Sequence, residues 1–316
     1  MNVKQIFDLA IQLGISADLR GKTAVQKMLN RKKEQYEKMG KEQKAEFDTE
    51  ALINPYLDSR LHYDSGQPVK KVLTGIDMEG DEILLADKLG DIDLIIAHHP
   101  RGKALADLAD VMHLQADVYA QYGVPINVAE GVQHERIAEV ARGVNPVNHH
   151  RVIDLAKLIK ISYINVHTAA DNLVANFLKK KVTSAKLEYV GDIIKLLKEI
   201  PEYQEAIKQG AGPRILTGNT NNRCGKIAVT EITGGTEPSP KIYEKLAQAG
   251  IGTVLAMHLS EEHKKEAEAA HINVIIAGHI SSDSIGMNLF LDELEKKGIK
   301  IVPCSGLIRV SRNKKK

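Results

Sequence analysis

The chain has 316 residues, of which 43% are hydrophobic, and its 43 Lys and Arg residues nearly balance its 41 Asp and Glu residues, which gives a formal net charge of +2. This composition excludes a largely disordered chain, and the near-neutral charge argues against nucleic acid or a membrane surface as a partner. With two cysteines, no CxxC, no apolar run suited to a secretion signal and no stretch of about 18 apolar residues, we expect a soluble, cytoplasmic protein.

Residues 1–68 differ in character from the rest of the chain. Four apolar residues near the start follow the i, i+3, i+4, i+7 spacing of an amphipathic helix, namely Ile6, Leu9, Ala10 and Leu13. A highly charged segment follows, from Arg20 to Glu50. We predict a helical extension whose charges form a solvated face, with a partner or subunit contact as the alternative.

From Val69 the pattern changes to an alternation of strands and helices. Short apolar runs predict strands at 69–77, 92–97, 125–130 and 161–166. Helical spacing predicts helices at 81–89, 105–122, 154–160 and 190–210, the last of them interrupted at Pro201. Residues 69–210 are therefore predicted to form a first α/β lobe.

A second α/β lobe is predicted over 211–316, because the Gly-, Asn- and Thr-rich segment 210–225 indicates a boundary. Beyond it, strands are predicted at 226–232, 253–257, 272–277 and 299–302, and helices at 239–249, 260–270 and 283–297. Strands separated by helices imply mostly parallel or mixed sheets flanked by helices. The predicted fold class is α/β, with two lobes, a site between them and the N-terminal helical extension.

Four of the predicted strands lead directly into histidine. The strands at 92–97, 161–166, 253–257 and 272–277 are followed by His98 and His99, His167, His258 and, after one intervening glycine, His279. Ligands of open α/β sheets gather at the carboxyl ends of strands, and histidine is the commonest metal ligand. Any one of these histidines alone fits a structural role, but the group predicts a metal-dependent or acid/base site.

A carboxylate stands four residues after three of these histidines, in the pairs His167/Asp171, His258/Glu262 and His279/Asp283. That spacing is one helical turn if a helix begins there, but chance alone produces some such pairs. Their position at strand ends is what sets these three apart. Pro100, after His98 and His99, favours a turn that brings both imidazoles to one place.

The motifs IIAHHP, NVHTAAD and IIAGHISSD, in this order, resemble the GTP cyclohydrolase I type 2 homolog family, also called the Nif-three-like dinuclear metal proteins. That family carries a His-His-Pro motif, a His-Thr-Asn-Leu-Asp motif and a late Gly-His motif followed by an acidic residue. The likeness extends from about Val69 to Gly306. It implies metal ligands at His98, His99, Asp171, His279 and Asp283.

This sequence departs from the family at Asp283, where the usual residue is Glu. A side chain shorter by one methylene must lie closer to the ions or bind one of them only, so the filling of both positions is open. The resemblance also implies supporting roles for further residues. His167 is a candidate outer ligand. The candidate catalytic group consists of His258, Glu262 and His263. Its members would act as outer ligands, hydrogen-bond partners or proton shuttles.

Imidazole and carboxylate without thiolate suit Zn, Fe, Mn or Ni, and two divalent ions bridged by Asp171 could activate water. Arg101 and Lys103 are candidates for holding an anionic substrate, with solvated surface as the alternative. The resemblance implies a metal-dependent hydrolase of a nucleotide or another small phosphorylated or cyclic-amide substrate, assembled as a ring or hexamer. The alternatives are a non-catalytic metal-binding scaffold and a regulatory interaction protein.

Overall fold

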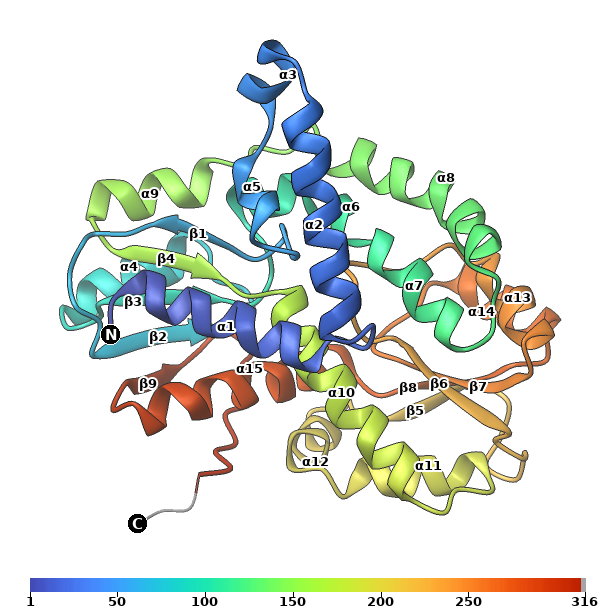
Figure 1. Ribbon diagram of the computed structural model, residues 1–316. Helices are drawn as coiled ribbons and strands as arrows, with labels where there is room; N and C mark the ends of the chain where they lie inside the picture. The colour runs from blue at the N-terminus through green and yellow to red at the C-terminus, as the bar shows by residue number, and fades with distance from the viewer. Residues whose placement is uncertain (314–316) are drawn as a thin grey trace.

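Two mixed sheets, each flanked by helices, form the framework of the computed structural model, which describes residues 1–313 (Figure 1). The predicted fold class, α/β with two lobes, is confirmed. None of the helices in the described residues combines the length and the apolar character that a membrane span requires.

The first sheet has the strand order β1-β4-β3-β2-β9, and β1 is its one antiparallel member among the described strands. In that order the strands are Arg60–Tyr63, Ser162–Asn165, Leu94–Ala97, Lys71–Gly75 and Lys300–Pro303. The predicted strands at 69–77, 92–97, 161–166 and 299–302 correspond to β2, β3, β4 and β9. β3 is buried and apolar throughout, which is typical of a parallel strand covered on both faces.

The second sheet has the order β5-β8-β7-β6, with β5 antiparallel to β8 and the other neighbours parallel. In that order the strands are Arg214–Thr217, Asn273–Ile276, Ile251–Ala256 and Lys226–Glu231. The parallel strands β6, β7 and β8 were predicted. β5 lies inside the segment 210–225 that the sequence indicated as a boundary loop.

The sheets do not follow the chain in strict order. β1 lies within residues 1–68 and β9 within 211–316, yet both belong to the sheet built mainly from residues 69–210. The division of the chain at residues 68 and 210 stays a prediction.

One predicted strand is wrong. Residues 125–130 begin the helix α8 (Ile126–Val144) rather than a strand. Pro125 stands at its N-cap, where the missing amide hydrogen costs nothing, and Ala129, Gln133 and Val140 are buried along the helix. Residues 125–130 read as a short apolar run, but the helix continues beyond them to Val144, for nearly four further turns.

The other helices of the first lobe follow the prediction with adjustments. The long helix at 105–122 is divided into three, and the stretch 190–210 is divided at Pro201, which begins its own helix as predicted. The bounds are α4 Gly80–Leu89, α5 Gly102–Ala106, α6 Leu108–Val111, α7 His113–Gln121, α9 Arg151–Ile159, α11 Val190–Lys198 and α12 Pro201–Lys208.

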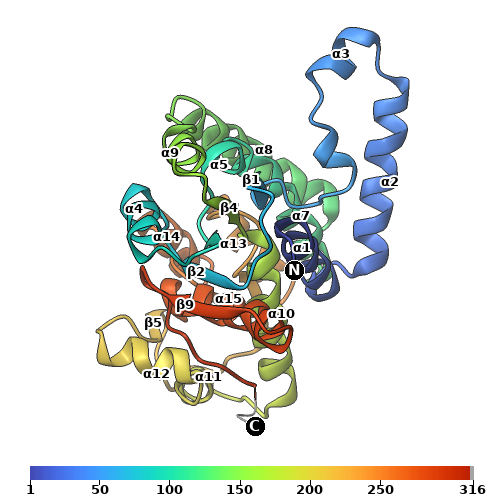
Figure 2. The same ribbon diagram turned by 90° about the vertical axis from the view of Figure 1, so that its left-hand side faces the viewer.

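The N-terminal residues form helices, as expected, but these divide into two kinds. α1 (Val3–Ala17) packs against the body of the protein, whereas the segment that contains α2 (Lys22–Lys38) and α3 (Lys41–Glu46) stands away from it (Figure 2). A 3-10 turn, η1 (Thr49–Leu52), follows on the way back to β1. In α2 only Val25 and Leu29 are buried, which agrees with the predicted solvated face.

Two long helices cross at the centre of the molecule and connect the lobes (Figure 1). α10 (Thr168–Ser184) follows β4, and α15 (His279–Lys296) follows β8. Two shorter helices of the second lobe, α13 (Ile242–Gln248) and α14 (Glu261–Ala269), lie between α10 and α15 in sequence. α10 was not predicted, because the residues it buries first are small or polar, from Thr168 to Asn172, and make no stripe of large apolar side chains.

The crossing is close because Gly286 has no side chain. A Cβ built there would lie 2.9 Å from the carbonyl carbon of Ala170 on α10, which is shorter than ordinary van der Waals contact. Gly14 of α1 meets α10 in the same way, since a Cβ there would lie 2.8 Å from the Cα of Ala169. Two adjacent residues of α10 are thus held by backbone contact with two different helices.

We predict that Gly286→Ala destabilises the protein by about 1–3 kcal/mol, because the added methyl must push α15 away from α10. Chemical denaturation followed by circular dichroism measures the change. Gly131→Ala is the matched control, since Gly131 is an exposed glycine inside α8 with no atom within 4 Å of a built Cβ. It should stabilise the protein by about 0.5–1 kcal/mol. Equal effects of the two substitutions would contradict the close crossing.

Candidate metal centre

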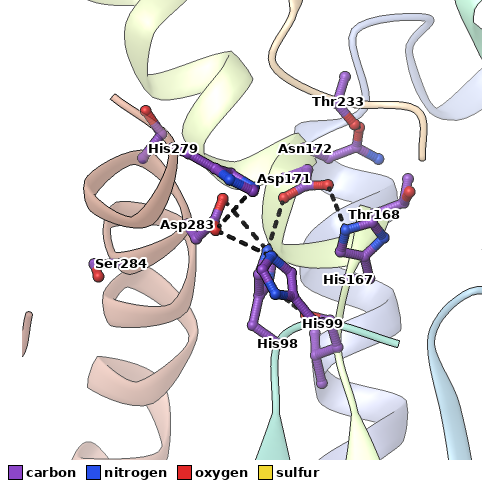
Figure 3. Close-up of polar contacts among 12 residues, drawn as sticks. His98, His99, His167, Thr168, Asp171, Asn172, Thr233, His279, Asp283 and Ser284 are labelled. Carbon is purple, nitrogen blue, oxygen red and sulfur yellow. Dashed lines mark hydrogen bonds and ion pairs between the residues drawn. The ribbon is translucent and has the colours of Figure 1, made fainter. Parts of the chain in front are cut away.

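The carboxyl ends of β3, β4 and β8 bring the predicted ligands to one place (Figure 3). His98 and His99 follow β3. α10 and α15 begin just after β4 and β8, and they carry Asp171 in the first turn of α10 and Asp283 as the fifth residue of α15. The five residues that the resemblance implies as ligands therefore lie together, namely His98, His99, Asp171, His279 and Asp283. His167 lies beside them.

Imidazoles and carboxylates alternate across the site. The Nε2 of His98 lies 3.4 Å from Oδ1 of Asp171 and 3.5 Å from Oδ1 of Asp283. On one side, the other oxygen of Asp171 faces Nε2 of His167 at 3.9 Å. On the other side, Oδ2 of Asp283 lies 3.4 Å from Nε2 of His99 and 3.5 Å from Nε2 of His279. Asp283 thus touches three imidazoles, although it is shorter than the family's usual Glu.

These spacings fit ligands around metal ions better than hydrogen bonds. Two donor atoms held at about 2.0–2.2 Å from one ion in tetrahedral geometry lie about 3.3–3.6 Å from each other. Two overlapping groups of three donors could each hold an ion, namely His98, His167 and Asp171, and His98, His99 and Asp283.

Several donor atoms of the site are buried without a partner. Within the described residues, Nε2 of His98, Oδ1 of Asp171 and both carboxylate oxygens of Asp283 have no hydrogen-bond partner. A buried polar atom without a partner is costly, and a buried unpaired carboxylate is more so. The donor set of these residues therefore fits a metal ion, which would satisfy all four atoms.

The pKa shifts of Asp171 and Asp283 also favour a bound cation. Burial raises the pKa of Asp171, and the neighbouring charges of Asp283 and Asp58 raise it further. Burial acts in the same direction on Asp283, but the imidazoles of His98, His99 and His279 outweigh it and lower its pKa. Two carboxylates this close both ionise readily only when a cation lies between them.

The imidazoles are oriented by hydrogen bonds from their second nitrogen. Nδ1 of His98 donates to the carbonyl oxygen of Val166 at 3.0 Å. Nδ1 of His99 donates to Asp77 at 2.8 Å, and Nδ1 of His167 donates to Asp58 at 2.7 Å. Each bond leaves the lone pair of Nε2 free on the side of the carboxylates, as metal-binding histidines require.

Sequence reasoning missed Asp58 and Asp77. Asp77 follows β2 at the same sheet edge as the histidines, so its strand-end position was an available signal. Asp58 is fully buried just before β1, and it also accepts a hydrogen bond from Thr168 at 2.6 Å. No spacing in the sequence indicated that β1 pairs with β4, so nothing placed Asp58 beside His167.

The predicted catalytic group is not brought together as one cluster. His258 lies at the site, with its ring centroid 4.4 Å from that of His279, and its Nδ1 donates to Glu237 at 2.8 Å. His263 is buried, and its two ring nitrogens bond to Ser260 and to the carbonyl oxygen of Pro238. This arrangement ties α14 to the loop after β6. Glu262 is exposed on α14.

The two candidate anion-binding residues are paired with carboxylates of the same chain. Arg101 bonds to Asp77 at 3.3 Å and to Glu79 at 2.5 Å. Lys103, which is about half exposed, lies 2.6 Å from Asp48. Their role toward an anionic substrate stays a prediction.

A narrow cavity of about 40 Å³ lies against the metal-binding side chains, between the two lobes. Metal-site residues form one part of its lining, namely His167, Asp171, His279 and Asp283. The remainder comes mainly from the end of β6 and the loop that follows, including Glu231, Thr233 and Glu237, and from Gln115 and His258. Such a volume holds about three water molecules or one small chemical group.

The chain has matches among solved structures. No family model matches the chain, and no curated protein matches it. Among solved structures, the chain is similar to a NIF3 superfamily protein from Sphaerobacter thermophilus, with a TM-score of 0.72, 27% identity, and coverage of 79% of this chain and 92% of that one.

Two further structures match with a TM-score of 0.49. One is reduced HcgD from Methanocaldococcus jannaschii, with 16% identity over 75% of this chain and 84% of that chain. The other is protein ybgI, with 14% identity over 81% of this chain and 92% of that chain. The resemblance to the Nif-three-like proteins that the sequence motifs predicted is confirmed by the similarity to the Sphaerobacter protein.

We predict that Asp58→Asn weakens metal binding about 10–100-fold, because an amide in place of the carboxylate no longer fixes His167 with its Nε2 free. Competition with a fluorescent chelator measures the affinity. Asp87→Asn, on the exposed face of α4, is the control and should leave the affinity unchanged. Unchanged affinity in Asp58→Asn, with normal folding, would show that the hydrogen bond does not support a metal ligand.

Proposed function

We propose that this chain, which shares the fold of the NIF3 superfamily, binds two divalent metal ions and acts in the cytoplasm as a metal-dependent hydrolase. The observation that supports this most strongly is the row of buried, unpartnered donor atoms on His98, Asp171 and Asp283, which borders a cavity. A structural core would not leave four such atoms unsatisfied.

The donors divide between two positions, because Nε2 of His98 can bind only one ion. We propose that one position uses Asp171 with His98 or His167, and that the other uses Asp283 with His99 and His279. Either carboxylate could bridge, since each presents its two oxygens to different imidazoles. The set of nitrogen and oxygen donors without sulfur fits Zn, Fe, Mn or Ni.

When bound, such ions would supply Lewis-acid polarisation of a substrate oxygen and a lower pKa for a water molecule that attacks it. Residues of the chain would accept protons and orient the metal ligands. His258, whose Nδ1–H is held by Glu237, lines the cavity, and its Nε2, which has no hydrogen-bond partner among the described residues, could accept a proton there. Through their hydrogen bonds, Asp77 and Asp58 would hold the rings of His99 and His167 in place during the reaction.

The size of the cavity limits what can react there. A volume of about 40 Å³ admits a phosphoryl or amide group but not a whole nucleotide. If the substrate is a nucleotide, its remaining parts must lie outside this cavity. We therefore favour a small phosphorylated or cyclic-amide substrate, or a nucleotide that inserts only its reacting group.

The same small volume favours a second candidate function, a non-catalytic protein that holds metal ions. A substrate must displace water from the cavity, whereas a metal-binding scaffold needs no space for one. Turnover of any compound that depends on Asp171 would decide between the two.

We also propose that the protein forms a homo-oligomer, as the family resemblance implies. Large apolar side chains are exposed on neighbouring helices, with Leu84 on α4 54% exposed and Leu158 on α9 80% exposed. Surfaces of this kind are commonly covered by another subunit. Analytical ultracentrifugation would measure the subunit number.

We predict that the purified protein carries transition metal and that His98→Ala and Asp171→Asn each lose most of it. Elemental analysis measures the content. A panel of nucleotides, phosphoesters and cyclic amides, tested with wild type and Asp171→Asn, should identify a hydrolysed compound whose turnover disappears in the variant. Asp154→Asn, on the exposed face of α9, is the control. Unchanged metal content in both site variants would overturn the proposal.

A further inference from the structure

The wall of the cavity supplied by the second sheet contains a buried acid that the metal site does not use. Glu231 is the last residue of β6 and lines the cavity. Its Oε1 accepts a hydrogen bond from the phenol of Tyr119 at 3.2 Å. Within the described residues, its Oε2 is buried and has no partner.

The histidines His167, His258 and His279 line the same cavity as Glu231. The titratable groups that are electrostatically coupled to Glu231 are neutral or negative. Tyr119 comes from α7, Tyr243 from α13 and Glu237 from the loop after β6. The charge of Glu231 is felt by Tyr243, whose fully buried hydroxyl has no hydrogen-bond partner in the described part of the chain. No ion pair among the described residues includes Glu231. Tyr119, Tyr243 and Glu237 would not compensate the charge of a carboxylate here.

Burial, with a further contribution from the negative Glu237, raises the pKa of Glu231 to about 8. The hydrogen bond from Tyr119 acts in the opposite direction but is the smaller effect. Below pH 8 the group is therefore mainly the neutral acid. With Oε1 as the carbonyl oxygen that accepts from Tyr119, the proton is carried by Oε2, the atom without a partner.

The other carboxylates at the cavity are already engaged. Asp171 and Asp283 face the imidazoles of the metal site, and Glu237 accepts the hydrogen bond from His258. Glu231 is thus the one carboxyl group lining the cavity, among the described residues, that can offer a hydrogen to a bound molecule.

We propose that Glu231 is a further catalytic residue, a neutral carboxylic acid that donates its hydrogen to the leaving atom of the substrate across the cavity from the metal ligands. The substrate class is then an ester or amide of a small acid with a basic leaving oxygen or nitrogen. This rests on the hydrolase function proposed above.

The proton balance of the step is complete. As the attacking water forms its new bond to the phosphorus or carbonyl carbon, the bond to the leaving atom breaks and its electron pair stays with that atom. Oε2 of Glu231 transfers its proton to the leaving atom and becomes a carboxylate. The proton released by the attacking water passes to Nε2 of His258 and from there to solvent, and Glu231 regains a proton from solvent before the next turnover.

The protonation of Glu231 can be tested without any substrate. A group with a native pKa near 8 and an ordinary unfolded value near 4.5 keeps its proton on folding, so its contribution to stability is fully present below pH 4.5 and is lost as the pH rises to 8. Glu231→Gln removes this dependence. The melting temperature of Glu231→Gln minus that of wild type should increase from pH 5 to pH 8 and then remain constant.

The control is Glu244→Gln, which changes an exposed carboxylate on α13 and should give the same difference at every pH between 5 and 8. An infrared spectrum of the metal-loaded protein provides a second measurement, because the band of a protonated carboxyl should be present in wild type at pH 6.5 and weaker in Glu231→Gln. A difference in melting temperature that does not change with pH, or an unchanged infrared band, would overturn the proposal.

Donation to a ligand is tested with inorganic phosphate, which requires no turnover. Its affinity for the metal-loaded full chain should decrease more steeply above pH 8 in wild type than in Glu231→Gln, as measured by calorimetry. Identical pH profiles would contradict donation by Glu231. With a hydrolysed ester, Glu231→Gln should lower kcat about 10²–10⁴-fold for poor leaving groups, with little change for p-nitrophenol and little change in KM.

The two failures are distinguishable. If no compound is hydrolysed, the hydrolase function fails, whereas the melting and infrared measurements still decide whether Glu231 holds its proton. If a compound is hydrolysed and Glu231→Gln cleaves poor and good leaving groups as fast as wild type, the hydrolase function stands and the role of Glu231 is rejected.

Discussion

The close packing of α10 against α15 is the constraint on which the rest of the structure depends. Because Gly286 has no side chain, α15 approaches the backbone of α10 at Ala170. Asp171 directly follows Ala170, and Asp283 lies three residues before Gly286, so the crossing carries one carboxylate from each helix toward Nε2 of His98. A larger side chain at the crossing would separate the helices and, with them, the two carboxylates. The packing of two helices from different lobes therefore determines the geometry of the candidate metal centre.

This packing has an electrostatic cost that a cation would offset. Burial and mutual repulsion disfavour two ionised carboxylates, and the raised pKa of Asp171 reflects both. The hydrogen bonds from His99 to Asp77 and from His167 to Asp58 keep the imidazole lone pairs directed at the same small volume. The fold thus arranges buried donor atoms, four of which have no hydrogen-bond partner among the described residues, where they would stabilise a divalent ion well. Across the cavity, Glu231 forms no ion pair with any described residue, and this difference in surroundings separates a metal-binding carboxylate from a neutral acid.

Much of the framework could be predicted from the sequence, because β3, β4, β7 and β8 are apolar runs with clear ends and a strand end fixes where the next residue lies. That reasoning placed His98, His99 and His167 at one sheet edge. It failed for segments that bury small or polar residues instead of large apolar ones. α10 buries small and polar residues, and α8 begins with a run that reads as a strand. Asp58 and Glu231 could not be assigned, since their roles depend on β1 pairing with β4 and on phenols that approach from distant helices.

The central claim is that these imidazoles and carboxylates hold a pair of metal ions. X-ray absorption spectroscopy of the metal-loaded protein tests it most directly, because it reports the atoms around the metal itself. The account predicts nitrogen and oxygen neighbours at about 2.0–2.2 Å and a second metal at about 3.5–4 Å, both lost in Asp171→Asn. Sulfur neighbours, or a spectrum that is the same in wild type and Asp171→Asn, would contradict it.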